Sequence, residues 1–326
     1  MKTVSCREIK NLELLFNYLK LENILEIVRC ESSQNIVYKI NNKYIVKKFS
    51  HDAIGNRKDL NKRKLQIEVS EILRENNIKT ITPLKFKNKY FIYFKGDYYL
   101  IYNYFNYQTL DRKDINDKKI VVMGSTMANI HNLNIVNNLP CSYSKIDINL
   151  DNYLNKVKKY DIDQYNLVLK NKLKLMKLIN EVNDSLRKIK KNKLCISHND
   201  YKYLNMLWNK NDLYLLDFDA CGMSLPNVAL VEAAYALSLN HNQLDLRHYK
   251  LFLKSYLSIR NINEEEYDLG IKMAMNCKLQ WLNYMISKTL KRRDSDMDEG
   301  IRYMINELVT FQNNKLKMMN AYLSRK

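Results

Sequence analysis

The sequence predicts an α+β protein with two lobes: a small N-terminal lobe built on a five-stranded antiparallel sheet plus a helix, and a larger, mainly helical C-terminal lobe. Three observations support this. The 326 residues exceed what a single hydrophobic core usually needs. Short β-like runs fill the first third of the chain, and from about Thr109 onward the pattern is mainly helical, interrupted by residues 195–208 and 213–221. We expect lobes of residues 1–103 and 104–326.

The first predicted element is an opening helix. Ser5 followed by Glu8 has the pattern of a capping box, in which each side chain accepts a hydrogen bond from a backbone amide at the helix start. Behind this cap, apolar residues recur at the spacing of one helix face, at Leu12, Leu15, Phe16 and Leu19.

Five β-like runs follow. The second and third are separated by Asn41 and Asn42, a pair that favours a tight hairpin turn. A helix from about Asp59 to Glu75 separates the third run from the fourth, and a short turn containing Gly96 joins the last two. The runs are residues 24–28, 36–40, 44–49, 90–94 and 98–105.

The formal charge of +19 would attract phosphate groups. The lysine excess, however, accompanies abundant asparagine, isoleucine and tyrosine, a composition that an AT-rich genome produces without any partner. No basic run carries the interleaved aromatic residues or the motif of a nucleic-acid binder. We therefore expect no nucleic-acid partner.

No long apolar run or signal-like start occurs, so neither a membrane partner nor secretion is expected. The six cysteines include no Cys-x-x-Cys pair, which argues against zinc and against a disulfide framework. The expected location is cytoplasmic, and the oligomeric state stays open.

Two otherwise apolar segments, residues 195–208 and 213–221, carry a concentrated set of polar groups. Phosphoryl transfer from ATP needs a carboxylate that orients the attacking hydroxyl and accepts its proton, and oxygen ligands that hold Mg²⁺ on the phosphates. The segments supply groups of these kinds at His198, Asp200, Asn205, Asp217 and Asp219.

Each of these residues fits one role in that chemistry. Asp200 is expected to be the catalytic base, and His198 to brace its loop by hydrogen bonding. Asn205 and Asp217 are the expected metal ligands, one neutral and one charged. Asp219 is either a second acidic metal ligand or a cap of its loop, and the sequence leaves the two open.

The motif His-Asn-Asp-x-x-x-x-Asn, followed by a strand and Leu-Leu-Asp-Phe-Asp, resembles the signature of the aminoglycoside phosphotransferase and choline kinase superfamily. This superfamily has a protein-kinase-like fold and includes kinase-like spore-coat proteins. The Asp200-x-Lys202 spacing is also similar to that of eukaryotic-type protein kinases, in which this lysine contacts the transferred phosphate. The resemblance covers about Cys30 to Leu237 and implies ATP and Mg²⁺ as cofactors, with a hydroxyl of a small molecule as acceptor.

The resemblance extends to the nucleotide side of the site. The segment 32–40 is similar to the family's polar phosphate loop, which implies that Ser33 and Asn35 contact the phosphates. Strand alternation places Lys47 on the nucleotide-facing side and Lys48 on the other side.

Lys47 would need a carboxylate to hold it, and the helix that follows offers two. Glu68 lies at the margin of the apolar stripe of that helix and Glu71 lies well outside it, so Glu68 is the expected partner. The resemblance also implies a hinge whose backbone amides hydrogen-bond adenine, at Asn103, Tyr104 and Phe105.

Two positions depart from the family pattern. Tyr107 stands where the family often has glycine, and Ala229 stands where an aspartate normally anchors the catalytic loop. Glu232 is a nearby candidate to compensate. His131 is expected to lie in the core or to support the site, and not to be catalytic. Trp281 and Tyr284 are expected in the core, with a cage for a cation as the alternative.

The sequence therefore predicts an ATP- and Mg²⁺-dependent phosphotransferase that acts on a hydroxyl of an aminoglycoside-like or amino-alcohol substrate. The alternative is a catalytically weak, kinase-like structural protein such as a spore-coat component, which Ala229 makes credible. A cationic substrate would need a locally acidic or aromatic pocket. The acidic segments 264–268 and 294–299 are candidates for it, and the alternative is that they are solvated helix ends.

Overall fold

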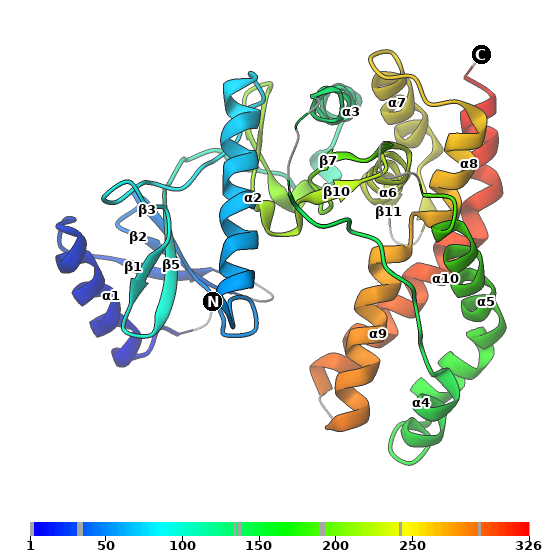
Figure 1. Ribbon diagram of the computed structural model, residues 1–326, viewed down its shortest axis with the longest axis horizontal. Helices are drawn as coiled ribbons and strands as arrows, with labels where there is room; N and C mark the ends of the chain where they lie inside the picture. Colours follow the sequence, from blue (N-terminus) through cyan, green and yellow to red (C-terminus); the bar gives the residue numbers. More distant parts are fainter. Residues whose placement is uncertain are drawn as a thin grey trace. The chain divides into compact units, whose positions relative to one another are not determined.

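The chain folds into two compact units (Figure 1). Unit 1 contains Met1–Thr109 and Met206–Asp219, and unit 2 contains Leu110–Asn205 and Ala220–Lys326. The structure is a computed structural model, and the residues it describes are 3–30, 35–133, 135, 138–189, 193–240, 243–292 and 295–325.

Unit 1 is built on a five-stranded antiparallel sheet with the strand order β1-β2-β3-β5-β4, which confirms the predicted sheet. The β2–β3 turn uses Asn41 and Asn42 with φ of 51° and 49°. Asparagine tolerates this left-handed conformation, and such turns match the twist of a hairpin. The strands are β1 (Ile27–Cys30), β2 (Ile36–Ile40), β3 (Tyr44–Lys48), β4 (Ile92–Phe94) and β5 (Asp97–Asn103).

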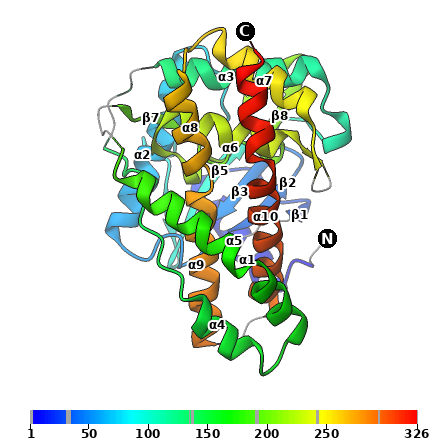
Figure 2. The same cartoon turned by 90° about the vertical axis from the view of Figure 1, so that its right-hand side faces the viewer.

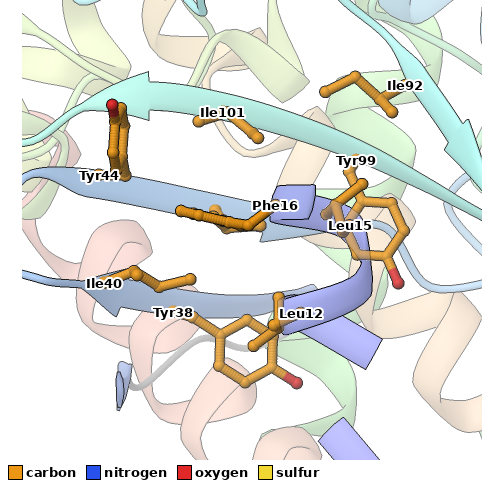
Figure 3. Close-up of a cluster of buried hydrophobic side chains, with 10 residues drawn as sticks. Leu12, Leu15, Phe16, Tyr38, Ile40, Tyr44, Ile92, Tyr99 and Ile101 are labelled. Carbon is orange, nitrogen blue, oxygen red and sulfur yellow. The ribbon is translucent and has the colours of Figure 1, made fainter. Parts of the chain in front are cut away.

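Helix α1 (Cys6–Leu19) covers one face of this sheet. Its start carries the predicted capping box between Ser5 and Glu8. Figure 3 shows the apolar residues of α1 packed against every second residue of the strands. Burial of each such side chain contributes about 1.5–3 kcal/mol, and the cluster consists of Leu12, Leu15, Phe16, Tyr38, Ile40, Tyr44, Val46, Ile92, Tyr99 and Ile101.

Helix α2 (Arg57–Glu75) covers the opposite face, so the sheet lies between α1 and α2 (Figure 1). Ile67 of α2 belongs to a second cluster with Phe49 and Leu100. Successive residues of β3 point to opposite faces, so Val46 joins the α1 cluster whereas Lys47 lies on the α2 face. The strand phase predicted for Lys47 is therefore correct.

A second, three-stranded sheet belongs to unit 1 and has the order β6-β8-β9, with β6 at Gln108–Thr109. Strands β8 (Met206–Asn209) and β9 (Asp212–Leu215) form a hairpin in which Met206 pairs with Leu215. The backbone amide of Ile81 donates to the carbonyl of Leu215 at 3.0 Å. The hairpin is thereby fixed to the segment after α2, and Asp217 follows its second strand.

Unit 2 is mainly helical, as predicted, and Figure 2 looks onto its long C-terminal helices. Helix α6 is buried on nearly all sides, which fits its almost uninterrupted apolar sequence. The helices are α3 (Asp117–Asn132), α4 (Leu150–Val157), α5 (Ile162–Leu186), α6 (Pro226–Ser238), α7 (Leu246–Leu257), α8 (Glu264–Met273), α9 (Asn276–Lys291) and α10 (Ser295–Leu323).

One short ladder in unit 2 joins the strand before the first predicted motif to the strand after the second. Strand β7 (Cys195–Ser197), which precedes His198, pairs antiparallel with β10 (Gly222–Ser224), which follows the second motif. Across the described ranges, no helix combines the length and the apolar character needed to cross a bilayer.

Candidate functional site

The first polar set lies in unit 2, directly after β7, and Asp200 is its centre. Asp200 Oδ2 accepts a hydrogen bond from Asn205 Nδ2 at 2.7 Å and forms an ion pair with the Lys202 ammonium at 2.9 Å. Asn205 Nδ2 also donates to the Asp200 carbonyl at 2.9 Å. The structure therefore brings three predicted site residues together. The side-chain amide nitrogen of Asn205 faces Asp200, so these contacts do not use its amide oxygen.

Backbone contacts close the same loop. The Lys202 amide donates to the Asp200 carbonyl at 3.0 Å, and the Asn205 amide donates to the Lys202 carbonyl at 2.9 Å. The second bond begins a single 3-10 turn at Tyr203–Asn205. These contacts explain the spacing of the motif, because one short turn returns the residue five positions after Asp200 to its carboxylate.

His198 lies beneath this loop with 2% of its surface exposed. Its ring packs edge-on against Tyr201, with 6.1 Å between ring centroids. Tyr201 is also buried, and its hydroxyl donates to the Met123 carbonyl of α3 at 2.8 Å. The apolar residues of the motif thus fix the loop to α3, while Asp200 and Lys202 remain partly exposed.

Asn199 is a further residue of the loop, whose role the motif spacing does not predict. Its φ of 58° is left-handed, a conformation that asparagine adopts more readily than most residues. Asn199 Nδ2 donates to Ser142 Oγ at 2.7 Å and to the Ala220 carbonyl at 3.1 Å, and Asn199 Oδ1 accepts from Ser224 Oγ at 2.6 Å. The signal in the sequence was an asparagine between the two functional residues of the motif.

The predicted compensation for Ala229 by Glu232 is not what the described contacts show. Ala229 is buried, and the loop is instead tied to β10 through Asn199. Glu232 keeps partial access to solvent, yet burial of its carboxyl raises its pKa to about 8 against the opposing charge of Lys278. Its other ionisable neighbours are Tyr143 and Cys277.

The second polar set lies in unit 1 and is centred on Lys47. The Lys47 ammonium donates to Asp219 Oδ2 at 2.7 Å and to Asp217 Oδ1 at 2.9 Å. Lys47 is 8% exposed. Burial alone would lower its pKa, but the negative charges of Asp219 and Asp217 outweigh this and raise the pKa above the ordinary lysine value. The lysine therefore stays charged.

Asp217 and Asp219 are held differently. Asp217 has a left-handed φ of 55°, and its side chain is 47% exposed. Asp219 is 27% exposed. Its Oδ2 also accepts from Asn35 Nδ2 at 3.2 Å, and its backbone carbonyl accepts from Arg63 and Gln66 of α2 at 2.6 and 2.8 Å.

The expected pairing of Lys47 with Glu68 is wrong for this structure, because Glu68 is exposed and Lys47 pairs with the two aspartates. The buried face of α2 is rotated relative to the predicted apolar stripe. It includes the polar residues Gln66 and Ser70, which hydrophobic spacing alone cannot assign to an interior.

The predicted phosphate loop is seen only in part, since Ser33 lies outside the described residues. Asn35 is 8% exposed. Besides its bond to Asp219, it accepts from the Ser50 amide at 3.3 Å through Oδ1. Its side chain therefore links the start of β2 to the segment after β3, in addition to any contact with phosphate.

At the predicted hinge, β5 ends at Asn103. The Tyr104 amide donates to the Lys43 carbonyl at 2.8 Å, so it is engaged within the protein, and the expectation that it binds adenine is corrected. The ring of Phe105 stacks on Tyr107, with 5.1 Å between centroids. Tyr107, at the position where relatives often have glycine, is thus part of an aromatic surface beside the hinge.

The three residues expected in the core have different outcomes. His131 is buried, with Nδ1 at 2.7 Å from the Tyr256 hydroxyl, and desolvation lowers its pKa to about 3. That prediction is confirmed. Trp281 and Tyr284 are 39% and 37% exposed and stack with 5.0 Å between centroids, so the prediction that they are core residues is wrong.

Part of the first acidic segment offered for a cationic substrate is used within the fold. Glu266 caps the start of α8 and lies 3.9 Å from Lys193, and Asp268 pairs with Lys272. Asp294, at the start of the second segment, lies outside the described residues. In the described ranges, no group of three or more His, Cys, Asp or Glu residues is arranged to hold a metal ion.

The antiparallel sheet with its α2 helix, the helical unit 2 and the two polar sets define a protein-kinase-like phosphotransferase fold. The choline/ethanolamine kinase family matches residues 26–313, and the chain belongs to that family. Comparison with curated proteins gave no significant match.

Solved structures of small-molecule kinases share the fold. A spectinomycin phosphotransferase in complex with ADP and spectinomycin is 13% identical, with a TM-score of 0.69 over 95% of this chain and 100% of that one. An amicoumacin kinase in complex with AMP-PNP and Ca²⁺ is 14% identical, with a TM-score of 0.59 over 93% and 96%. An ethanolamine kinase of Plasmodium vivax is 17% identical, with a TM-score of 0.56 over 89% and 83%.

Proposed function

We propose that this protein is a small-molecule kinase that transfers the γ-phosphate of ATP to a hydroxyl group in a Mg²⁺-dependent reaction. The observation that carries the proposal is the Asp200 carboxylate, oriented by Lys202 and Asn205 in a loop whose apolar residues are buried. Membership of the choline/ethanolamine kinase family supports the same reaction class. Residues 1–103 would bind the nucleotide, and residues 104–326 would supply the base and the acceptor site.

The role of Asp200 follows from its contacts. Its Oδ2 accepts from Asn205 and pairs with the Lys202 ammonium, and these contacts hold the carboxylate in the loop. The group would orient the acceptor hydroxyl and take its proton as the oxygen attacks. Lys202, which pairs with Asp200 at 2.9 Å, would balance negative charge on the transferred phosphate.

The residues present fit a magnesium ion. Mg²⁺ prefers oxygen ligands and commonly takes few from the protein, the remainder coming from phosphates and water. The Asn205 amide oxygen and the Asp217 carboxylate would hold it, and the 47% exposure of Asp217 agrees with a role toward a ligand. When bound, the ion would neutralise phosphate charge. Lys47 would contact the phosphates, and the amides of Asn103 and Phe105 would contact adenine.

The acceptor is proposed to be an amino alcohol or an aminoglycoside-like molecule. Support comes from the family and from the fold shared with an ethanolamine kinase and a spectinomycin phosphotransferase. The exposed stack of Trp281 and Tyr284 offers an aromatic surface, although the Lys288 ammonium already lies 5.3 Å from the Tyr284 centroid. That lysine disfavours a second cation on Tyr284.

The deciding experiment is phosphate transfer from ATP to a panel of amino alcohols, aminoglycosides, sugars and peptides, with and without Mg²⁺. We expect Mg²⁺-dependent product with at least one amino alcohol or aminoglycoside. Product that forms only with sugars or peptides would refute the acceptor class while preserving the reaction. Failure of the protein to bind nucleotide, measured by calorimetry, would favour the structural-protein alternative that Ala229 raises.

A further inference from the structure

Four side chains from three separate segments converge on Asp219 within unit 1. Its Oδ2 accepts from Lys47 of β3 and from Asn35 at the start of β2, and its carbonyl accepts from Arg63 and Gln66 of α2. All four of these donors are largely buried, with side-chain exposures of 10% for Lys47 and 14% for Arg63. The Asp219 side chain is 27% exposed, but two donors hold its carboxylate and two hold its backbone carbonyl, so the residue is fixed in place.

Helix α2 contributes donors, and no carboxylate, to this cluster. Gln66 and Arg63 occupy the part of α2 that faces Asp219, while Glu68 is exposed. The Arg63 guanidinium also lies 3.8 Å from Asp219 Oδ2. Lys47 pairs with both Asp217 and Asp219, and Arg63 lies beside Asp219, so no carboxylate from α2 is needed to balance the charge of Lys47.

We infer that Asp219 is the residue that positions Lys47 for the nucleotide, in place of a carboxylate from helix α2, and that it is not a metal ligand. This inference names a positioning residue of the proposed reaction and rests on the proposed function for its catalytic consequence. Asp219 Oδ2 is engaged by Lys47 and Asn35, so a metal ion there would have to displace an ammonium group. Asp217 also accepts from Lys47, at 2.9 Å, but its side chain is the more exposed of the two, 47% against 27%.

Arg63 and Gln66 have a defined part in this arrangement. Both donate to the backbone carbonyl of Asp219, which fixes the main chain next to the carboxylate that holds Lys47. The neighbouring cavity of about 20 Å³, lined by these residues and Tyr102, has room for about one water molecule. Arg63 and Gln66 therefore fix the position of Asp219, and Asp219 in turn links helix α2 to Lys47.

The first test needs no catalysis. Acetylation of lysines in the metal-free protein, followed by mass spectrometry, reports how well Lys47 is protected, and Lys48, paired with Asp97 on the opposite face, is the internal control. We expect Asp219→Asn to increase labelling of Lys47 about 10-fold, Arg63→Met to give a smaller increase, and Asp217→Asn to change it by less than 3-fold. Labelling of Lys48 and the circular dichroism spectrum should stay unchanged.

The outcome of labelling decides between the two aspartates. Equal deprotection of Lys47 by Asp217→Asn and Asp219→Asn, or none by Asp219→Asn, would overturn the inference. If Asp219→Asn fails to fold, Arg63→Met carries the test, because protection of Lys47 that is independent of Arg63 contradicts the coupling to α2. This readout applies even to a protein that transfers no phosphate.

The second test measures the consequence for nucleotide use. Asp219→Asn should raise KM for ATP about 10-fold, with the Mg²⁺ concentration for half-maximal activity changed by less than 3-fold. Rescue of Asp219→Asn by added Mg²⁺ would identify Asp219 as a metal ligand and overturn the inference. A wild-type protein without any nucleotide binding would instead refute the proposed function, and the labelling result would still judge the role of Asp219.

Discussion

The two polar sets of this protein are assembled in opposite ways. Around Asp200, the partners are two and five residues away in the sequence, and a single turn closes the loop. Around Lys47, the partners Asp217 and Asp219 are 170 and 172 positions away, and the contact depends on the sheet, on α2 and on the β8–β9 hairpin. The first set is local and the second is made by the fold.

This difference decides how each set responds to change. A local set depends on its own turn and on a few buried anchors, so a substitution there should alter chemistry with little effect on nucleotide binding. The Lys47 set joins several elements, so its loss should alter ligand binding and the fold of unit 1 together. Substitutions in the two sets should therefore separate into distinct kinetic classes.

The largest effect is expected at Asp200. Asp200→Asn should lower turnover by about 100-fold to 10,000-fold, because a base acts mainly in the transition state. Affinity for ATP, measured by calorimetry, should change by less than about 3-fold because the amide still accepts from Lys202 and Asn205. Full turnover in this variant would show that the loop has no catalytic role, and the contrast between the two sets would then not hold.

The next largest effect is expected at Lys47, with its neighbour as a matched control. Lys47→Ala should lower kcat/KM for ATP by about 10-fold to 100-fold, in line with about 1.5–3 kcal/mol for charge-assisted bonds. Lys48 pairs with Asp97 on the other face, so Lys48→Ala should change kcat/KM by less than about 2-fold. Steady-state kinetics that show equal losses for both variants would contradict the assignment.

The sequence predicted the local set well and the long-range set poorly, for the same physical reason. The spacing of Asp200, Lys202 and Asn205 fits a single turn, so their proximity follows from the chain itself. The partner of Lys47 depends on which face of α2 is buried. That face includes Gln66 and Ser70, whose burial is stabilised by contacts that only the folded chain supplies.

The strands show the same division. Alternation placed Lys47 and Lys48 on opposite faces correctly, because side-chain direction is a local property of a strand. Aromatic residues of α9 were expected to be buried because they are large and apolar, yet Trp281 and Tyr284 stack on each other at the surface. Which apolar residues remain exposed depends on what packs beside them.

Asn199 belongs to both patterns, because it lies in the local loop but makes long-range contacts. Asn199→Gly keeps the left-handed backbone without strain and removes the side-chain contacts to Ser142, Ala220 and Ser224. Loss of these three hydrogen bonds, of about 0.5–1.5 kcal/mol each, should lower kcat about 10-fold with KM for ATP unchanged.

Asn199→Asp is a more stringent variant at the same position. It preserves the acceptor for Ser224 but turns an oxygen toward the Ala220 carbonyl, so kcat should fall further than in the glycine variant. Measurement of kcat, KM and Tm for both variants separates positioning from stability. Unchanged kcat in Asn199→Gly would show that the loop is held by other contacts.

The smallest effect is expected at Glu232, which separates the stability of unit 2 from the positioning of the loop. Burial raises the folded-state pKa of Glu232 from 4.5 to about 8. The folded protein then holds a proton that the unfolded chain has lost, so the contribution to the free energy of unfolding is fully present below about pH 4.5 and decreases as the pH rises to about 8. Glu232→Gln removes this dependence, because glutamine does not titrate.

We expect the Glu232→Gln variant to raise Tm at pH 8.5 by about 2–4 °C, to leave Tm nearly unchanged at pH 4, and to leave kcat within about 2-fold of wild type. Thermal unfolding at both pH values, followed by circular dichroism, checks the sign. A fall in kcat comparable to that of Asn199→Gly would show that Glu232 anchors the catalytic loop after all, and would make the Asp200 set less local than its contacts indicate.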